Sequence, residues 1–344
     1  MNNPDKISER DYLFDNLKAL LIVLVVLVHL FAPVKKQFGA NVWIDRFLVL
    51  ACSFHMPLFV FISGYFSKNI QKGREKAGEI LVLFFIGQLL IVLTRFLLYG
   101  EAITLSSLLK PQFSMWYLLA LFLWRSFLGG LVRIRYILPV AFVLNILIMG
   151  TDLQTWCIRV VSFAFFFLAG YYTQKDTIGK IRRLPKAVPI LALLVGVVSV
   201  EMVISGGIVS AGTLRAMMLR TITVDHFDGS PLYGYLGFVY IFVLAVLMCG
   251  VLLALFPSKK TCFSYLGQNS LTIYLGQAVL YIVFYRKIIN LPMLAESALK
   301  AYLAATVLSV LCILIFGNDK ASGGFNRAVK KIYALVRKPE EASR

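Results

Sequence analysis

The chain has 344 residues, of which 59% are apolar and only 15% are charged. A soluble domain carries about 25% charged residues because water must solvate its surface, so this composition excludes a single soluble core. The formal net charge of +18 would suit a nucleic-acid-binding protein, but the distribution of that charge favours another explanation, given below.

Apolar residues occur in about ten blocks, most of them close to the roughly 20 residues needed to cross a bilayer. Most blocks are apolar on all faces, which is typical of membrane spans and not of amphipathic soluble helices. The expected spans cover residues 17–32, 47–66, 80–98, 115–131, 136–149, 156–172, 188–204, 232–256, 270–284 and 294–316. We therefore predict an all-α polytopic membrane protein. Within the longest external loop, residues 213–224 are expected to form a short interfacial or re-entrant helix.

Lysine and arginine gather in alternate loops between these blocks, which indicates membrane topology and not a nucleic-acid partner. The residues placed on the cytoplasmic side are Lys68, Lys72, Arg74, Lys76, Arg133, Arg135, Lys175, Lys180, Arg182, Arg183, Lys186, Lys259, Lys260, Lys330, Lys331, Arg337 and Lys338. This pattern predicts that both termini are cytoplasmic. The expected organisation is an N-terminal segment over residues 1–16, a membrane domain over 17–316 and a basic tail over 317–344.

Two of the three histidines, His29 and His55, lie inside apolar blocks. Ionisable groups cost a few kcal/mol at the centre of a span, so they indicate function by default. A neutral imidazole can accept a proton near physiological pH, which suits a general base that activates a hydroxyl. His55 also precedes Pro57, which frees a backbone carbonyl within the second span. The alternative is that both histidines only form hydrogen bonds between helices.

Lys18 precedes His29 by eleven residues, a spacing that returns to nearly the same helix face at about 100° per residue. The two residues are then about 16 Å apart along the axis, at 1.5 Å per residue. They cannot touch each other, but one elongated ligand can touch both. A thioester donor with phosphates near Lys18 and its reactive end near His29 fits this spacing. The alternative is a lysine that only marks the membrane edge.

Two motifs at these residues resemble the membrane acyltransferases known as acyltransferase family 3, and in particular the bacterial fucose 4-O-acetylase-like O-acetyltransferases. The first is Asp15-Asn-Leu-Lys18 followed by an aliphatic run that ends at His29. The second is Phe54-His-Met-Pro-Leu-Phe59 continuing to Ser63-Gly-Tyr65. Weaker matches are Met115-Trp-Tyr-Leu118, Phe167-Leu-Ala-Gly-Tyr-Tyr172 and Leu266-Gly-Gln-Asn-Ser270 ahead of Tyr274. The similarity extends from Arg10 to about Phe316.

This resemblance implies transfer of an acyl group, usually acetyl from acetyl-coenzyme A, to hydroxyls of cell-surface glycans or their precursors. It also implies essential roles for the basic residue and the histidine of the first span, here Lys18 and His29. The sequence departs from the family pattern at two positions. Lys18 stands where the family frequently has arginine. Lysine keeps the positive charge but cannot form the two parallel hydrogen bonds that a guanidinium makes to one anionic group. Gln277 in Tyr274-Leu-Gly-Gln277 stands where the family often has histidine.

Residues and resemblance together predict an integral membrane O-acyltransferase in the cell membrane. The predicted catalytic residues are His29 and His55. Predicted contacts to the acetyl-CoA donor come from Lys18, Arg74 and Lys76 through its phosphates, and from Trp116 and Tyr117 by stacking on adenine or on a sugar. The alternative for the two aromatic residues is that they only belong to the aromatic belt at the membrane interface.

The predicted partners are membrane lipid and a glycan or lipid-linked sugar acceptor, with no metal and no nucleic acid. A transporter or lipid-linked-sugar flippase that uses the same polar residues to line a pathway is the alternative. That alternative predicts internal repeats, and the sequence has no clear ones: Pro57 and Pro139 have no counterparts at matching offsets.

Overall fold

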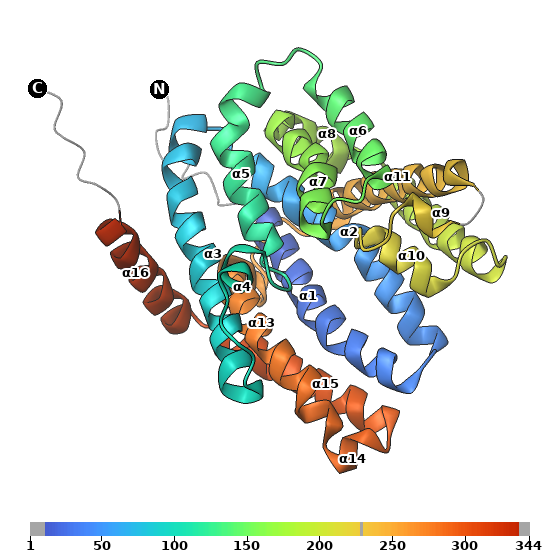
Figure 1. The fold of residues 1–344 in the computed structure, drawn as a ribbon. Helices are drawn as coiled ribbons and strands as arrows, with labels where there is room; N and C mark the ends of the chain where they lie inside the picture. The colour runs from blue at the N-terminus through green and yellow to red at the C-terminus, as the bar shows by residue number, and fades with distance from the viewer. Residues whose placement is uncertain (1–10, 228–229, 337–344) are drawn as a thin grey trace, which may run out of the picture.

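The computed structural model describes residues 11–227 and 230–336, and these residues contain helices and no strand (Figure 1). In chain order the helices are α1 (Leu13–Phe38), α2 (Val42–Tyr65), α3 (Ile70–Tyr99), α4 (Leu105–Leu109), α5 (Trp116–Leu131), α6 (Ile137–Leu147), η1 (Ile148–Gly150), α7 (Thr155–Tyr172), α8 (Lys175–Arg183), α9 (Ala187–Ser205), α10 (Ala211–Met218), η2 (Val224–His226), α11 (Pro231–Leu255), α12 (Ser264–Gln268), α13 (Ser270–Arg286), η3 (Ile288–Asn290), α14 (Pro292–Ala295), α15 (Ala298–Phe316) and α16 (Asp319–Val336).

Eight helical segments in the described part of the chain are long and apolar enough to cross a membrane. They are α1, α2, α3, α7, α9, α11, the segment Ser270–Asn290 that includes α13, and α15. Two shorter apolar helices, Trp116–Leu131 and Ile137–Gly150, coincide with the fourth and fifth predicted spans. The all-α polytopic membrane fold is therefore confirmed. The total of about ten spans and the orientation of the termini stay predictions.

Several helix boundaries differ from the sequence prediction. The first span is longer than expected, since α1 has 26 residues. Helix α3 begins at Ile70, ten residues before the predicted start at 80, because the Asn69 side chain accepts a hydrogen bond from the Lys72 amide at 2.9 Å and caps the helix. The last span begins four residues late, at Ala298, after the separate turn of α14.

The predicted helix over residues 213–224 is wrong in extent. Helix α10 covers only Ala211–Met218, and η2 forms a separate turn at Val224–His226. The Ser210 side chain accepts a hydrogen bond from the Thr213 amide at 3.0 Å and starts the helix. Two residues after its end, Arg220 has a φ of 55°, a left-handed conformation that turns the chain away from the helix axis.

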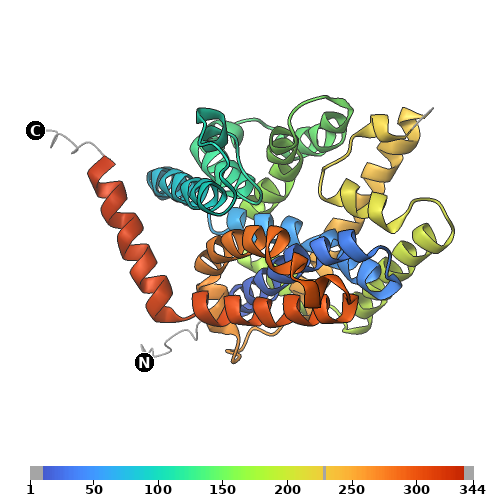
Figure 2. The same cartoon turned by 60° about the horizontal axis from the view of Figure 1, so that its bottom comes forward.

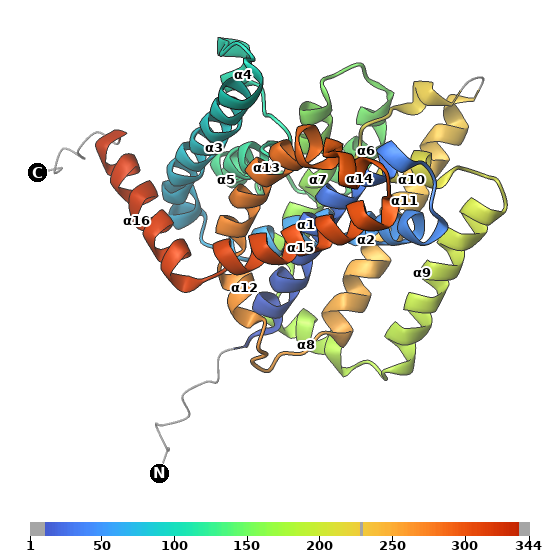
Figure 3. The same cartoon turned by 90° about the horizontal axis from the view of Figure 1, so that it is seen from below.

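Helices α1 and α2 lie at the centre of the bundle, between α13 and α15 on one side and α7 on the other (Figures 1 and 3). The crossing of α2 and α7 is tight because glycines face the partner backbone. A Cβ added at Gly64 would collide with the Phe167 carbonyl, and one at Gly170 would collide with the Phe61 carbonyl. Small residues at such crossings allow backbones to approach closely. This crossing sets the spacing between the α2 and α7 side chains that line the site below.

The first turn of α1 is fastened to the segment before α13, which fixes the position of Lys18. Buried Asn16 donates hydrogen bonds to the carbonyls of Pro257 and Lys259, both at 2.9 Å. Its side-chain oxygen accepts hydrogen bonds from Ser264 at 2.6 Å and Thr261 at 2.9 Å. A fully satisfied buried amide of this kind holds two segments in one register.

Helix α16 extends away from the bundle (Figure 2). Its Tyr333 packs over Gly78 of α3 and donates a hydrogen bond to the Glu75 carbonyl at 3.4 Å. The predicted basic tail therefore begins with a helix over Asp319–Val336. Residues 337–344 of that tail and residues 1–10 of the predicted N-terminal segment lie outside the described residues.

Candidate active site

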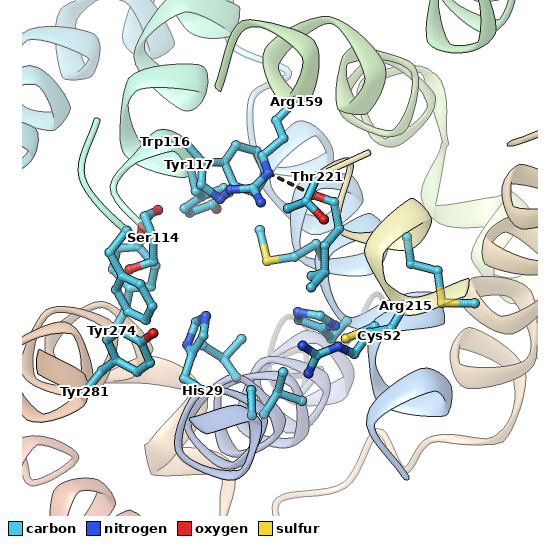
Figure 4. A pocket seen from close by; sticks show the side chains of 18 of the residues that line it. His29, Cys52, Ser114, Trp116, Tyr117, Arg159, Arg215, Thr221, Tyr274 and Tyr281 are labelled. Carbon is cyan, nitrogen blue, oxygen red and sulfur yellow. Dashed lines mark hydrogen bonds between the residues drawn. The ribbon is translucent and has the colours of Figure 1, made fainter. Parts of the chain in front are cut away.

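A cavity of about 320 Å³ lies inside the bundle around His29 and His55, and we call it the histidine cavity (Figure 4). Its lining comes from α1, α2, α5, α7, α10 and α13 and from the residues next to α5 and α10. The lining residues are Val25, Val28, His29, Ala32, Cys52, His55, Met56, Phe113, Ser114, Trp116, Tyr117, Arg159, Phe163, Arg215, Met218, Leu219, Thr221, Tyr274 and Tyr281. The two histidines are thus brought to one cavity by the packing of α1 against α2.

Gln277 fixes the orientation of the His29 ring. The side-chain nitrogen of Gln277 donates to the Tyr274 carbonyl at 3.1 Å and lies 3.3 Å from the Ser114 hydroxyl. Because a carbonyl can only accept, this network assigns the amide oxygen to the side that faces His29, where it lies 3.0 Å from Nδ1. His29 therefore donates through Nδ1, and the lone pair of the neutral ring is on Nε2.

His55 has the same tautomer for a different reason. Its Nδ1 lies 2.8 Å from the carbonyl oxygen of Ala51, one turn earlier in α2. That carbonyl can only accept, so Nδ1 carries a proton, and in the neutral ring the lone pair is on Nε2. In their neutral form both imidazoles of the cavity keep a lone pair on Nε2 and can each accept a proton.

An aromatic wall supports His29 on a second side. The Phe113 ring lies 4.5 Å from the His29 ring and stacks on Tyr281 at 4.1 Å. Phe113 has a φ of 50°, a left-handed conformation that is unfavourable for a bulky residue. Strained backbone persists only where surrounding contacts hold it, and such positions cluster at functional sites.

Arg159 supplies free hydrogen-bond donors to the cavity. Its Nε donates to the Leu219 carbonyl at 2.9 Å, the dashed line in Figure 4. Its guanidinium lies 5.3 Å from the Trp116 ring, within cation–π distance. Within the described residues no other hydrogen bond engages this guanidinium, which leaves its terminal nitrogens for a ligand.

A second cavity of about 260 Å³ adjoins the first, and we call it the lysine cavity. Its basic lining residues are Lys18 and Arg125. Lys18 forms an ion pair with Asp15 at 3.0 Å, and the Arg125 Nε donates to the Ser67 hydroxyl at 3.2 Å. Four residues line both cavities: Val25, Met56, Tyr117 and Tyr274. Lys18 and His29 therefore line neighbouring spaces in the interior of the bundle.

The profile of a family described as "Acyltransferase domain" matches residues 11–317. The chain belongs to this acyltransferase family. The match confirms the resemblance and the predicted enzyme class, and it places the protein among the membrane acyltransferases.

Two curated proteins are similar to a short part of this acyltransferase. Nodulation protein NolL of Sinorhizobium fredii is 42% identical over 62 residues, which are 18% of this chain and 17% of that protein. Nodulation protein NolL of Mesorhizobium japonicum is 38% identical over 66 residues, which are 19% of this chain and 18% of that protein. The chain thus matches less than a fifth of the length of these relatives. No solved structure matches the chain.

The acyltransferase fold brings five of the seven predicted site residues to the two cavities. His29, His55 and Trp116 line the histidine cavity, Lys18 lines the lysine cavity, and Tyr117 lines both. The other two, Arg74 and Lys76, are exposed in the first turns of α3 and line neither cavity. Contacts of these two residues to a donor stay a prediction.

Other residues of the acyltransferase site were not predicted from the sequence. Ser114 and Phe113 precede α5 and have no distinctive motif. Arg125, Arg159 and Gln277 are polar residues inside apolar blocks, which indicates function. An arginine inside a span is a candidate oxyanion donor, but the sequence does not say which arginine faces the site. Arg215 stands in the predicted external loop, where a charge is ordinary, and only the folding of α10 onto α2 brings it to the cavity.

Proposed function

We propose that this acyltransferase moves an acetyl or similar acyl group from acyl-coenzyme A to a hydroxyl of a cell-surface or exported glycan or its precursor, at the cytoplasmic membrane. The observation that carries the proposal is the free Nε2 of His29, held by Gln277 in a cavity that adjoins a second, basic cavity. Family membership supports the reaction class. The chemistry of the two cavities supports the donor and acceptor.

The donor occupies the lysine cavity and reaches into the histidine cavity. Lys18 and Arg125 bind its phosphates, for which a cation and a guanidinium are the usual partners in proteins. The pantetheine arm passes the shared wall at Val25 and Met56. The spacing of about 16 Å between Lys18 and His29 along α1 suits an arm of that kind.

The acceptor hydroxyl lies against His29 Nε2, which takes its proton as a general base. The hydroxyl oxygen attacks the thioester carbonyl, and the carbonyl oxygen becomes an oxyanion. The free terminal nitrogens of Arg159 donate to that oxyanion, and such donors work best when they are already in place. The intermediate collapses, the C–S bond breaks, and the proton on His29 passes to the thiolate of coenzyme A. His55 Nε2 accepts a hydrogen bond from a second hydroxyl of the acceptor and orients it.

The test uses purified protein in liposomes with radiolabelled acetyl-CoA and an oligosaccharide acceptor. His29→Ala should lower product formation by about 10²- to 10⁴-fold, the usual contribution of a general base. His226→Ala is the matched control, because His226 is exposed in η2 and lines neither cavity. Full activity of His29→Ala would contradict the proposal, as would movement of a lipid-linked sugar across the bilayer without any acyl donor.

A further inference from the structure

The histidine cavity carries unbalanced positive charge. Two arginines, Arg159 and Arg215, line it, and its lining residues include no aspartate or glutamate. Guanidinium groups stay protonated in proteins, so neither charge can be lost by deprotonation. Both arginines are partly buried, and a charge that is withdrawn from water is normally paired, because an unpaired one is poorly solvated. A cavity of this kind favours a ligand that carries a permanent negative charge.

Arg215 lies at the edge of the cavity on a helix that is packed into the bundle. Its neighbours Leu214 and Met218 on α10 are 1% and 5% exposed and anchor the helix in the bundle. Figure 4 shows Arg215 beside Cys52 of α2, across the cavity from Trp116 and Ser114. The Nη1 atom of Arg215 is buried and has no hydrogen-bond partner among the described residues. A buried donor without a partner is unfavourable, so this atom is available to an acceptor atom that a ligand brings.

The acyl donor and the reaction intermediate do not account for this charge. In the proposed function the donor phosphates lie with Lys18 and Arg125, in the other cavity. The oxyanion exists only transiently, and Arg159, anchored at the Leu219 carbonyl, already serves it. Arg215 remains available for a group that is charged throughout the reaction. A guanidinium pairs best with a planar carboxylate or with a phosphate.

We infer that Arg215 binds a carboxylate or phosphate on the acceptor, so that the preferred acceptor is an acidic sugar. This inference rests on the proposed function for its link to acyl transfer, but the binding site itself does not depend on it. Arg215 selects the acceptor through its charge, and His29 acts on a hydroxyl elsewhere on the same sugar. The two sources of negative charge, carboxylate and phosphate, are separated by the experiment.

The experiment measures equilibrium binding to the full protein in detergent by calorimetry, without acyl donor. The probes are methyl glucuronide, glucose 6-phosphate and the neutral methyl glucoside. Wild-type protein should bind at least one acidic probe about tenfold or more tightly than methyl glucoside, a difference of about 1.4 kcal/mol, since a charge-assisted hydrogen bond is stronger than a neutral one. The tighter acidic probe identifies carboxylate or phosphate. Arg215→Gln should remove this preference, and Arg215→Lys should keep part of it.

Arg133→Gln is the matched control, because Arg133 is exposed between α5 and α6 and lines neither cavity. It should bind all probes as the wild type does. Equal wild-type binding of acidic and neutral probes would overturn the inference even if Arg215→Gln failed to fold. Unchanged acidic preference in Arg215→Gln would also overturn it.

Transfer assays separate this inference from the proposed function. If acetyl transfer to neutral and acidic sugars falls equally in Arg215→Gln, Arg215 acts on the reaction itself, and only the inference fails. If acidic probes bind through Arg215 but no acyl transfer occurs with any acceptor, the inference holds and the proposed function fails.

Discussion

The His29 side chain is restrained from two directions that are far apart in sequence. Gln277 of α13 accepts the Nδ1 proton at 3.0 Å, and Phe113 from the loop before α5 covers the ring at 4.5 Å. A base must be held within a few tenths of an ångström of its working position for a hydroxyl to reach it. Gln277 is neutral, so it orients the imidazole without the added negative charge that a carboxylate would bring. We regard it as a positioning residue in the proposed reaction.

Gln277→Leu should lower kcat by about 10²-fold with little change in KM, because a base displaced by about 1 Å loses roughly that much rate. Gln277→Glu keeps an acceptor oxygen beside Nδ1 and should retain more activity than Gln277→Leu. Steady-state kinetics of both variants in liposomes make this measurement. Wild-type kcat in Gln277→Leu would show that the hydrogen bond to His29 has no part in the reaction.

Lys18→Met should raise KM for acetyl-CoA by about tenfold or more and leave kcat nearly unchanged. A hydrogen bond to a charged group contributes about 1.5–3 kcal/mol, and each 1.4 kcal/mol is tenfold in affinity. Lys18→Arg is the control, because it keeps the charge beside Asp15 and can form a bidentate contact. The measurement is KM as a function of acetyl-CoA concentration. An unchanged KM in Lys18→Met would remove Lys18 from the donor site.

At the scale of single helices, the crossing of α2 and α7 determines the width of the site. His55 and Arg159 come from these two helices and line the same cavity. Gly64 and Gly170 allow the backbones to touch, since a Cβ at either position would collide with a carbonyl of the partner helix. The sequence motifs that contain Gly64 and Gly170 therefore reflect helix packing as well as the chemistry of the site.

Gly170→Ala should destabilise the protein by about 1–3 kcal/mol, because an added methyl at a backbone contact must push the helices apart. Gly250→Ala in α11 is the matched control: a Cβ there meets no atom within 4 Å, and alanine favours a helix. The measurement is the midpoint temperature for thermal unfolding in detergent. A midpoint for Gly170→Ala as high as that for Gly250→Ala would contradict the tight crossing.

At the scale of the whole molecule, the two cavities lie one after the other along α1. The lysine cavity begins at Lys18, within two turns of the start of α1, and the histidine cavity reaches Ala32. Charges in the loops predict that the first turn of α1 faces the cytoplasm. In that orientation the lysine cavity is the one closer to cytoplasmic coenzyme A, which agrees with the proposed direction of donor entry.

This orientation can be tested with Cys262, an exposed cysteine between α11 and α12. A membrane-impermeant maleimide should label Cys262 only after cells are permeabilised, since the loop with Lys259 and Lys260 is predicted to be cytoplasmic. Ala40→Cys in a background with Cys157→Ala and Cys262→Ala should be labelled in intact cells, because residue 40 follows α1 on the predicted external side. The reverse labelling pattern would invert the topology.

The sequence by itself determined the all-α membrane architecture. It also identified Lys18 and His29 as candidate site residues on one helix. Apolar blocks of this length are stable only inside a lipid bilayer. A spacing of eleven residues places Lys18 and His29 on the same face of one helix through local geometry alone. These inferences depend only on the order of neighbouring residues, so no tertiary contact can change them.

Only the tertiary structure decided which residues meet His29. Gln277 lies 248 residues away along the chain, and Phe113 and Arg215 reach the cavity through a strained loop and a short helix. The same packing left Arg74 and Lys76 exposed on α3, although their charge suggested a donor site. Contacts between distant segments depend on how helices cross. A crossing such as that of Gly170 with Phe61 depends on the surface shapes of both helices, and the residue pattern of one helix does not contain this information.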